Sequence, residues 1–351
     1  MSEKYPVAQA QIVDAWEALC ATGDNRCVSV NTNKLDEIAS QNPELIVPDW
    51  RIPGLHPEND WAFATQAVAS SVINFMFLNR NRERDGEGWS MTDPTTGKTL
   101  SGSSALHPRL HACIGESEDV RASQLIQLAK KDVFDDFLPG VPMAEERREL
   151  LEEFAYGLHD YYEGSVRNLL DASRDQNGNL RLRNNGEGLV ERLTDTGKFG
   201  AAFLDISYLD NARVLPFNKR ANLAPLLIYG RSTTSSTLPR VADIHESGAV
   251  PDYRLPQAFR AMGAIAYSEA LAHTVDTWQP IPRDSQAEVE IRAATSYSTV
   301  YLLRQVNELR EQQGQAPNNM AHIDYWLWKM GRELKNDPNT KPPHYTETTA
   351  Y

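Results

Sequence analysis

The stretch MAEERRELLEEFAYGLHDYYEGSVRNLLDAS, residues 143–173, carries the clearest structural pattern in the chain. Its apolar residues recur at intervals of three and four, at Leu151, Phe154, Leu158, Tyr162, Val166 and Leu169. That spacing places them along one face of an α-helix and leaves most of the charged residues on the other face. The stretch therefore predicts a long amphipathic helix that packs against a core.

The same helical spacing recurs along most of the chain, whereas alternating runs of β-branched residues are scarce. Besides 143–173, the predicted helices cover 7–19, 61–78, a segment from Leu255, a segment from Ser285 and 320–334. Pro256 stands in the first turn of its helix, where proline is tolerated, and Ser285 with Glu288 matches the capping-box pattern. These features predict a mainly α protein.

Two segments depart from the helical pattern. Residues 79–108 are rich in Arg, Asp, Gly, Ser and Thr, which predicts a long irregular insertion or a short β-hairpin. Residues 335–351 form a C-terminal tail without periodicity. A length of 351 residues allows two domains of ~150 residues, but no obvious linker divides the chain. We therefore expect a single compact helical domain over 1–351, with an N-terminal helical extension at 1–60.

Charge and cysteine content narrow the class of protein. Thirty-five Lys and Arg against 48 Asp and Glu give a net charge of −13, so the chain has no global attraction for a nucleic-acid backbone. Cys20, Cys27 and Cys113 show no C-x-x-C spacing, which is typical of a reducing compartment and excludes a disulfide framework. No apolar run reaches the ~18 residues of a membrane span. The sequence predicts a soluble, cytoplasmic protein without a direct nucleic-acid or membrane partner.

Two partial motifs carry no function. Gly97-Lys98-Thr99 is like the end of a phosphate-binding P-loop, but Thr92 stands where the first glycine of that motif belongs. His107 and His111 have the spacing of zinc ligands on a helix, but Pro108 is expected to break that geometry, and the accompanying Glu is missing. We therefore expect neither a metal nor another cofactor.

Four stretches in the second half combine charged residues with apolar neighbours. They are LPFNKRANLA at 215–224, VPDYRLPQ at 250–257, AEVEIRAA at 287–294 and HIDYWLW at 322–328. Lys219 and Arg220 bring local positive charge to an acidic chain, and their apolar surroundings argue against a solvated surface pair. Asp252 precedes a helix whose positive end favours an ionised carboxylate, although a turn or capping role is the commoner one for such an Asp.

Together the four stretches resemble the queuosine salvage protein family over about residues 61–351. Four motifs of that family stand here, in order, as Lys219–Asn222, Asp252–Gln257 followed by Met262–Ser268, Glu288–Arg292 and Asp324–Trp328. Asn74-Phe75, inside the predicted apolar helix, is similar to the family's Asn-Phe element. Pro343-His344 and Tyr351 are similar to its C-terminal end.

The resemblance implies the helical architecture of DNA glycosylases and the hydrolysis of an N-glycosidic bond. The implied substrate is queuosine 5′-phosphate or a related 7-deazaguanine nucleotide, from which queuine is released for salvage into tRNA. Positive charge develops on the ribose in such a reaction, and Asp252 would stabilise it, position the water or attack as nucleophile, with Arg254 orienting the carboxylate. Lys219 would bind the 5′-phosphate, and Arg220 would pair with an acidic neighbour.

The resemblance also implies further substrate-binding residues. Glu288 or Glu290 would hydrogen-bond the base or the ribose hydroxyls, with helix capping and ion pairing along the helix as the structural alternatives. Asp324, Tyr325 and Trp326 would wall the base pocket or else belong to the core. The remaining implied substrate-binding residues are Asn74, Phe75, His344 and Tyr351.

Departures from the family pattern leave other functions open. Asn222 replaces a Gln, Leu226-Leu227-Ile228 stands where a carboxylate is expected, and Ser101–Leu106 replaces a Gly-Tyr-Trp-Ser-Leu segment. The alternative is therefore a catalytically silent or re-specialised relative that binds a nucleotide or a base. A nucleic-acid glycosylase is a third hypothesis, against which the acidic balance argues.

Overall fold

The computed structural model describes residues 7–22, 26–41, 43–79, 88–92, 97–209, 213–334 and 339–351. Within these ranges the chain forms fifteen α-helices: α1 (Val7–Thr22), α2 (Thr32–Ser40), α3 (Asp60–Val72), α4 (Ser103–Ile114), α5 (Ala122–Ala129), α6 (Lys131–Phe137), α7 (Ala144–Tyr162), α8 (Val166–Ala172), α9 (Leu189–Leu193), α10 (Thr196–Phe199), α11 (Lys219–Ser232), α12 (Arg254–Ala261), α13 (Glu269–Asp276), α14 (Gln286–Gln312) and α15 (Met320–Glu333). No helix in the described ranges is long and apolar enough to cross a membrane.

Strands in the described residues form only three two-stranded antiparallel sheets. The pairs are β1 (Val28–Val30) with β6 (Ile265–Tyr267), β2 (Ser90–Thr92) with β3 (Thr99–Ser101), and β4 (Ile206–Leu209) with β5 (Arg213–Pro216). The prediction of a mainly α protein with a β-hairpin near 79–108 is therefore confirmed.

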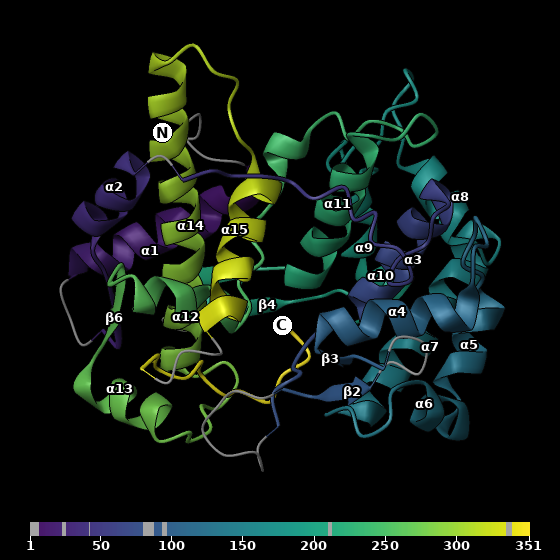
Figure 1. The fold of residues 1–351 in the computed structure, drawn as a ribbon, viewed down its shortest axis with the longest axis horizontal. Helices are drawn as coiled ribbons and strands as arrows, with labels where there is room; N and C mark the ends of the chain where they lie inside the picture. The colour runs from purple at the N-terminus through teal and green to yellow at the C-terminus, as the bar shows by residue number, and fades with distance from the viewer. Residues whose placement is uncertain are drawn as a thin grey trace.

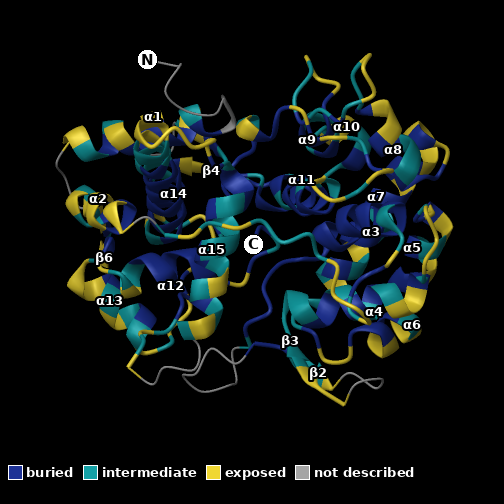
Figure 2. Ribbon diagram, turned by 45° about the horizontal axis from the view of Figure 1, so that its top comes forward, coloured by how far each residue is buried: buried dark blue, intermediate teal, exposed yellow. Residues whose placement is uncertain are grey.

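The helices lie in two groups on either side of the last residue of the chain (Figures 1 and 2). In one group α14 packs against α1 and α2, and α15 packs against α12. The other group holds α3–α10, and α11 packs closely on α3 while also contacting α15. Every residue of α3 from Trp61 to Val72 is buried, as its nearly all-round apolar sequence predicts (Figure 2).

The predicted helix over 61–78 ends early. α3 stops at Val72, so Asn74-Phe75 lies in an irregular segment and not inside a helix. The buried Arg147 of α7 donates hydrogen bonds to three backbone carbonyl groups within 73–76. These partners replace the hydrogen bonds of a helix, so the chain can leave the helical path in the interior without orphaned carbonyl groups.

The predicted single helix over 143–173 is two helices, α7 and α8. α7 ends at Tyr162, where Glu163 adopts a left-handed conformation with φ of 53° and the Gly164 N–H donates to Leu158 O at 2.8 Å. Gly164 itself has φ of 68°, a region that glycine adopts without strain. Because both helices pack on α3, the apolar spacing continues across the break, and periodicity alone does not show it.

The predicted insertion at 79–108 contains the β2–β3 hairpin, and residues 80–87 and 93–96 lie outside the described part. Its C-terminal bound was wrong, because α4 begins at Ser103 and continues through Pro108. A proline inside a helix removes one backbone hydrogen bond, and here burial of the side chain accompanies that loss.

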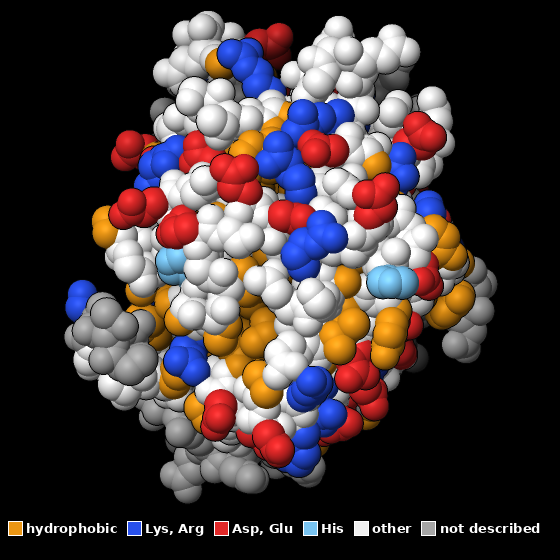
Figure 3. Space-filling view, turned by 90° about the vertical axis from the view of Figure 1, so that its right-hand side faces the viewer, with side chains coloured by type: hydrophobic (Ala, Val, Ile, Leu, Met, Phe, Trp, Pro, Cys, Tyr) orange, Lys and Arg blue, Asp and Glu red, His pale blue; other side chains and the backbone are white. Residues whose placement is uncertain are grey.

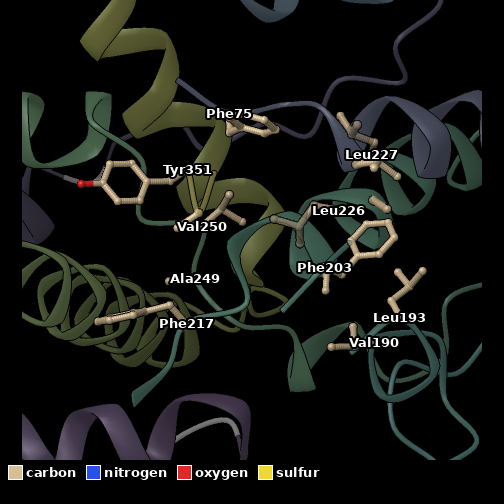
Figure 4. Packing of buried hydrophobic residues seen from close by; sticks show 14 of the residues in the cluster. Phe75, Val190, Leu193, Phe203, Phe217, Leu226, Leu227, Ala249, Val250 and Tyr351 are labelled. Carbon is tan, nitrogen blue, oxygen red and sulfur yellow. The ribbon is translucent and has the colours of Figure 1, made fainter. Parts of the chain in front are cut away.

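The described parts of the N-terminal and C-terminal segments are built into the fold. α1 packs on α14, β1 pairs with β6, and residues 43–59 carry no helix. In the predicted tail, where 335–338 lie outside the described residues, Tyr345 and Tyr351 are buried. Figure 4 shows Tyr351 among the buried hydrophobic residues of the interior.

A segment without secondary structure, residues 47–57, crosses from α2 toward α3, and we call it the strap. The fully buried Arg231 of α11 donates to the carbonyl oxygens of Asp49 and Trp50, each at 2.9 Å, and of Pro57 at 3.1 Å. Several charge-assisted hydrogen bonds to one guanidinium fix the path of the strap, which forms no helix or strand.

Arg220 was expected to pair with an acidic neighbour. Its hydrogen bonds in the described residues go instead to carbonyl oxygens, those of Val72 at 2.7 Å and of residues 201 and 202. Buried ion pairs of this region join Arg292 to Asp205 at 2.5 Å and to Glu288 at 3.7 Å.

The face formed on the side of α5, α7 and α8 carries acidic, basic and apolar side chains intermixed (Figure 3). Tyr156 and Tyr161 of α7 are exposed. Intermixed charges of both signs are typical of a solvated surface, so this face is not the basic groove that a nucleic-acid glycosylase needs.

Candidate active site

A cavity of about 230 Å³ lies where the two helix groups meet. α15 and the start of α12 line it from one group, and the start of α4 lines it from the other. α11, the strap and the irregular segment 74–77 complete its wall. The cavity is therefore assembled from segments that are far apart in the sequence.

The cavity brings together eight of the twelve site residues predicted from the sequence. They are Asn74, Phe75, Lys219, Asp252, Arg254, Asp324, Tyr325 and Tyr351. The four that do not line it are Glu288, Glu290, Trp326 and His344.

Asp252 caps the helix that follows it. Its Oδ1 accepts hydrogen bonds from the backbone N–H groups of Arg254 at 2.7 Å and Leu255 at 3.2 Å. The carboxylate is thus oriented by the positive end of α12, and the Arg254 guanidinium donates to Gln257 Oε1 at 3.0 Å. Asp252 lines the cavity and is partly exposed there.

Lys219 is the first residue of α11 and is almost completely buried. Its Nζ donates to Asn74 O at 2.8 Å, and its backbone N–H donates to Asp205 Oδ2 at 3.1 Å. The left-handed conformation of Asn218, with φ of 47°, begins the helix at this point. The end of α3 and the start of α11 therefore meet at the Lys219 side chain.

Asp252, Lys219 and Asp324 form one electrostatic unit, which we call the carboxylate–lysine cluster. Burial lowers the pKa of Lys219 to about 8, although both carboxylates oppose that shift. Burial also raises the pKa of Asp324 to about 8, with the negative charge of Asp252 adding to the rise and Lys219 opposing it. Burial raises the pKa of Asp252 as well, but Lys219 and the two backbone N–H groups favour its ionised form.

Asp324 has one further property. Its Oδ1 is buried and has no hydrogen-bond partner among the described residues. A carboxyl group near a second carboxylate cannot ionise easily, so Asp324 is the member of the cluster that keeps a proton at neutral pH. The cavity thus holds a protonated Asp324 beside Asp252, whose ionised form is favoured by Lys219 and two backbone N–H groups.

Aromatic rings line the part of the cavity formed by the strap and α15. The Trp50 ring meets Tyr325 edge to face, with 5.6 Å between ring centroids, and Tyr325 stacks on Trp328 at 6.0 Å. His56 lies against His107 at 5.4 Å, and burial lowers the pKa of His56 to about 3 and that of His107 to about 4, so both are neutral. Such a wall can hold a flat heterocycle by stacking and by imidazole hydrogen bonds.

The predicted residues outside the cavity support its wall. Glu290 accepts from the N–H groups of Cys27 at 2.7 Å and Val28 at 3.0 Å, which ties α14 to β1. Glu288 hydrogen-bonds the Tyr351 hydroxyl and accepts from the Asp284 N–H at 3.2 Å.

His344 Nε2 lies 3.0 Å from the Tyr351 hydroxyl. Glu288 and His344 therefore both contact the hydroxyl of Tyr351, whose side chain lines the cavity. Trp326 is half-buried on α15 and packs against the core.

Sequence reasoning missed several residues of the cavity. Trp50 and His56 come from the strap, which has no periodicity, and Arg332 belongs to no recognised motif. Ser103 and Ser104 lie in the Ser101–Leu106 segment, which the sequence analysis noted only as a departure from the family pattern. The spacing of His107 and His111 indicated that both could lie on one face of a helix. The sequence analysis set this pair aside because of Pro108, but α4 continues through that proline. Within the described residues no group of three or more His, Cys, Asp or Glu is placed to hold a metal ion.

The fold and the cavity define a mainly helical protein with two acids and a lysine beside an aromatic wall, an arrangement that suits cleavage of a bond to a heterocycle. A model of the queuosine salvage protein family matches residues 55–351. The chain therefore belongs to this family, and the resemblance inferred from the four motifs is confirmed.

The curated relatives carry one name, queuosine 5′-phosphate N-glycosylase/hydrolase. The protein of Sphaerobacter thermophilus is 26% identical over 309 residues, 85% of this chain and 86% of the relative. That of Bos taurus is 24% identical over 324 residues, 88% of each chain. That of Dictyostelium discoideum is 26% identical over 241 residues, 69% of this chain and 68% of the relative.

Proposed function

We propose that this protein hydrolyses the N-glycosidic bond of queuosine 5′-phosphate, or of a related 7-deazaguanine nucleotide, and releases queuine for salvage into tRNA. The relatives named for that activity support the proposal. The observation that carries it is the carboxylate–lysine cluster, in which two acids of one cavity differ in their readiness to ionise. Glycosidic cleavage uses that difference, because one group must be charged and the other must hold a proton.

Asp252 is the charged group in this proposal. As the C1′–N bond lengthens, positive charge develops on the ribose, and a fixed carboxylate stabilises it without reorganising. Asp252 is held by two backbone N–H groups, so its position is set before substrate binds. Water adds to C1′ and gives a proton to Asp252, or Asp252 bonds to C1′ first and water then displaces it.

Asp324 is the proton donor to the departing base. The base leaves with the electron pair of the broken bond and takes up a proton, which Asp324 carries at neutral pH. The positive charge of Lys219 acts on both acids and limits how far their pKa values rise. In the direct route the proton that water gives to Asp252 returns to Asp324 after the base leaves. In the covalent route the ionised Asp324 takes the proton of the displacing water, so in both routes the two acids regain their starting states.

The aromatic wall receives the base in this proposal, with Trp50, Tyr325 and Phe75 as its flat surfaces.

The partner in this proposal is a small nucleotide. We also propose a cytoplasmic location, supported by free thiols at Cys20, Cys27 and Cys113.

The test is direct. Purified protein is incubated with queuosine 5′-phosphate and in parallel with free queuosine, each with and without a metal chelator, and queuine is measured by chromatography. We expect queuine from the nucleotide in both conditions. No release from either compound would refute the proposed function.

One observation favours a second function, a relative that binds a base without cleaving it. Leu226 and Leu227 form an apolar part of the cavity wall, where the family pattern led us to expect a carboxylate. A rise in melting temperature with queuine, together with no turnover of either substrate, would select this function.

A further inference from the structure

Two histidines of the cavity, His56 and His107, have ring nitrogens that the fold itself does not use. Both side chains line the cavity, and their ring centroids lie 5.4 Å apart. Neither ring has a hydrogen-bond partner among the described residues, whereas His344 Nε2 lies 3.0 Å from the Tyr351 hydroxyl. A ligand that covers polar atoms must offer them partners, so these nitrogens can hold a ligand in this part of the cavity.

Both imidazoles are neutral at physiological pH. Burial lowers the pKa of His107 to about 4, and the positive charge of Lys219 adds to the shift. Burial lowers the pKa of His56 to about 3, and the charges of His107 and Arg231 add to that shift. A neutral imidazole has one N–H that donates and one nitrogen that accepts. The pair therefore presents donors and acceptors without a net charge.

The neighbours of the two rings show where they lie along the cavity. Lys219, a member of the carboxylate–lysine cluster, acts on His107, whereas Arg231, which holds the strap, acts on His56. The His56 ring in turn meets the Trp50 ring edge to face, with 6.0 Å between centroids. A base whose sugar carbon reacts at the cluster therefore passes His107 on its way to the aromatic wall.

This end of the cavity has an apolar wall where the family pattern has a carboxylate. Leu226 and Leu227 line the cavity one turn before Gly230, which lies against the strap. Among the described residues of the cavity wall, the carboxyl groups are those of Asp252 and Asp324, and both belong to the carboxylate–lysine cluster. A carboxylate would accept from N1–H and the 2-amino group of a guanine-type base together, and leucine accepts from neither.

We propose that His107 is a specificity-determining residue which, together with His56, binds the amide edge of the base, formed by the C6 carbonyl oxygen and N1–H. One imidazole donates to the carbonyl oxygen, and the other accepts from N1–H. The 2-amino group meets no carboxylate at this end, so a base without it binds nearly as well. The substrate class then includes 7-deazahypoxanthine nucleotides beside 7-deazaguanine nucleotides. The inference rests on the proposed function for the reaction, cleavage of the bond between base and ribose.

Binding of three free bases tests the assignment without turnover. They are 7-deazaguanine, 7-deazahypoxanthine, which lacks the 2-amino group, and 7-deazapurine, which also lacks the amide edge. Each is titrated into wild-type protein by calorimetry. We expect the first two Kd values to agree within about threefold and 7-deazapurine to bind roughly tenfold more weakly, because two uncharged hydrogen bonds are lost. A Kd for 7-deazahypoxanthine tenfold above that of 7-deazaguanine would overturn the proposal, as would equal binding of 7-deazapurine.

His107→Phe keeps a flat ring beside His56 and removes both ring nitrogens. We expect this variant to bind 7-deazahypoxanthine roughly 3–10-fold more weakly and 7-deazapurine as wild type does, since one uncharged hydrogen bond is lost. His107→Gln keeps a donor and an acceptor and should restore most of the preference for the amide edge. An equal loss for both bases in His107→Phe would show that the ring only supports the wall, and would overturn the proposal.

The matched control is His111→Phe, one turn further along α4. The His111 side chain does not line the cavity, and its Nε2 lies 3.4 Å from Glu116 Oε1. It should leave the Kd values of all three bases near wild type, and melting temperatures check the folding of every variant. If wild type releases queuine from neither nucleotide nor nucleoside, the proposed function fails, and these titrations still decide the role of His107. Wild-type protein that binds none of the three bases would overturn that role.

Discussion

Asp324→Asn tests the proton donor and should change both the activity and its dependence on pH. The wild-type carboxyl has a pKa of about 8, so about nine-tenths of it is protonated at pH 7 and about one-tenth at pH 9. kcat/KM should therefore fall about tenfold or more over this range. Asn has the shape of the acid but no transferable proton, so the variant should lose a factor on the order of 10²–10⁴ at pH 7.

Lys219 complicates the pH profile, because its pKa is also about 8 and it faces Asp324 from α11. The alkaline decrease that remains in Asp324→Asn belongs to Lys219 in our account. Carboxyl-carbon NMR of protein labelled at Asp separates the two groups, since it reports only the acids. We expect a resonance that titrates near pH 8 in wild type and is absent from the variant.

The neighbours of Asp324 predict two opposite shifts of that resonance. Asp252→Asn removes the negative charge that raises the pKa of Asp324, so the titration should move to lower pH. Lys219→Met removes the positive charge that lowers it, so the titration should move to higher pH. Shifts in the same direction would show that the three groups do not form one electrostatic unit.

The pH dependence of stability tests the raised pKa of Asp324 independently. A carboxyl whose pKa is raised in the folded state binds a proton on folding, so its contribution to stability falls as pH rises from about 4 to about 8. Asp324→Asn removes this penalty, and its melting temperature relative to wild type should increase between pH 4 and pH 8. A difference that stays constant over that range, or an Asp324 resonance that titrates near pH 4, would refute the assignment of Asp324 as the protonated acid.

Three further predictions concern the rest of the site. Asp252→Asn should lower kcat by a factor on the order of 10²–10³ and leave the Kd of queuine near wild type, and normal turnover would remove Asp252 from the mechanism. Lys219→Met should lower turnover of nucleotide and nucleoside by similar factors, because its ammonium lies with the carboxylates, and a loss confined to the nucleotide would assign Lys219 to the phosphate. Gly230→Ala places a Cβ 2.3 Å from Pro48 O, so it should displace the strap and raise KM several-fold. Gly157→Ala is the matched control, because its Cβ would also lie 2.3 Å from a backbone carbonyl oxygen, but away from the cavity. It should lower only the melting temperature. Equal KM values for these two variants would show that the strap does not shape the cavity.

The sequence predicted what depends on local pattern. Apolar periodicity was enough for α1, α14 and α15, and the helix-start pattern placed Asp252 two residues before α12. The ends of α3 and α7 were not predictable in the same way. α3 stops at Val72 because the Arg147 guanidinium, more than seventy residues along the chain, takes the carbonyl groups that follow. No local propensity encodes such a partner.

The residues of the candidate site also divide into those that stand in motifs and those that only tertiary contacts bring to the cavity. Asp252, Lys219 and Asp324 stand in motifs, so the resemblance singled them out before the structure brought them together. Trp50 and Arg332 reach the same cavity from a segment without periodicity and from the end of a helix. Their positions depend on tertiary contacts, such as the hydrogen bond from Arg231 to Trp50 O, and such contacts leave no pattern in the sequence.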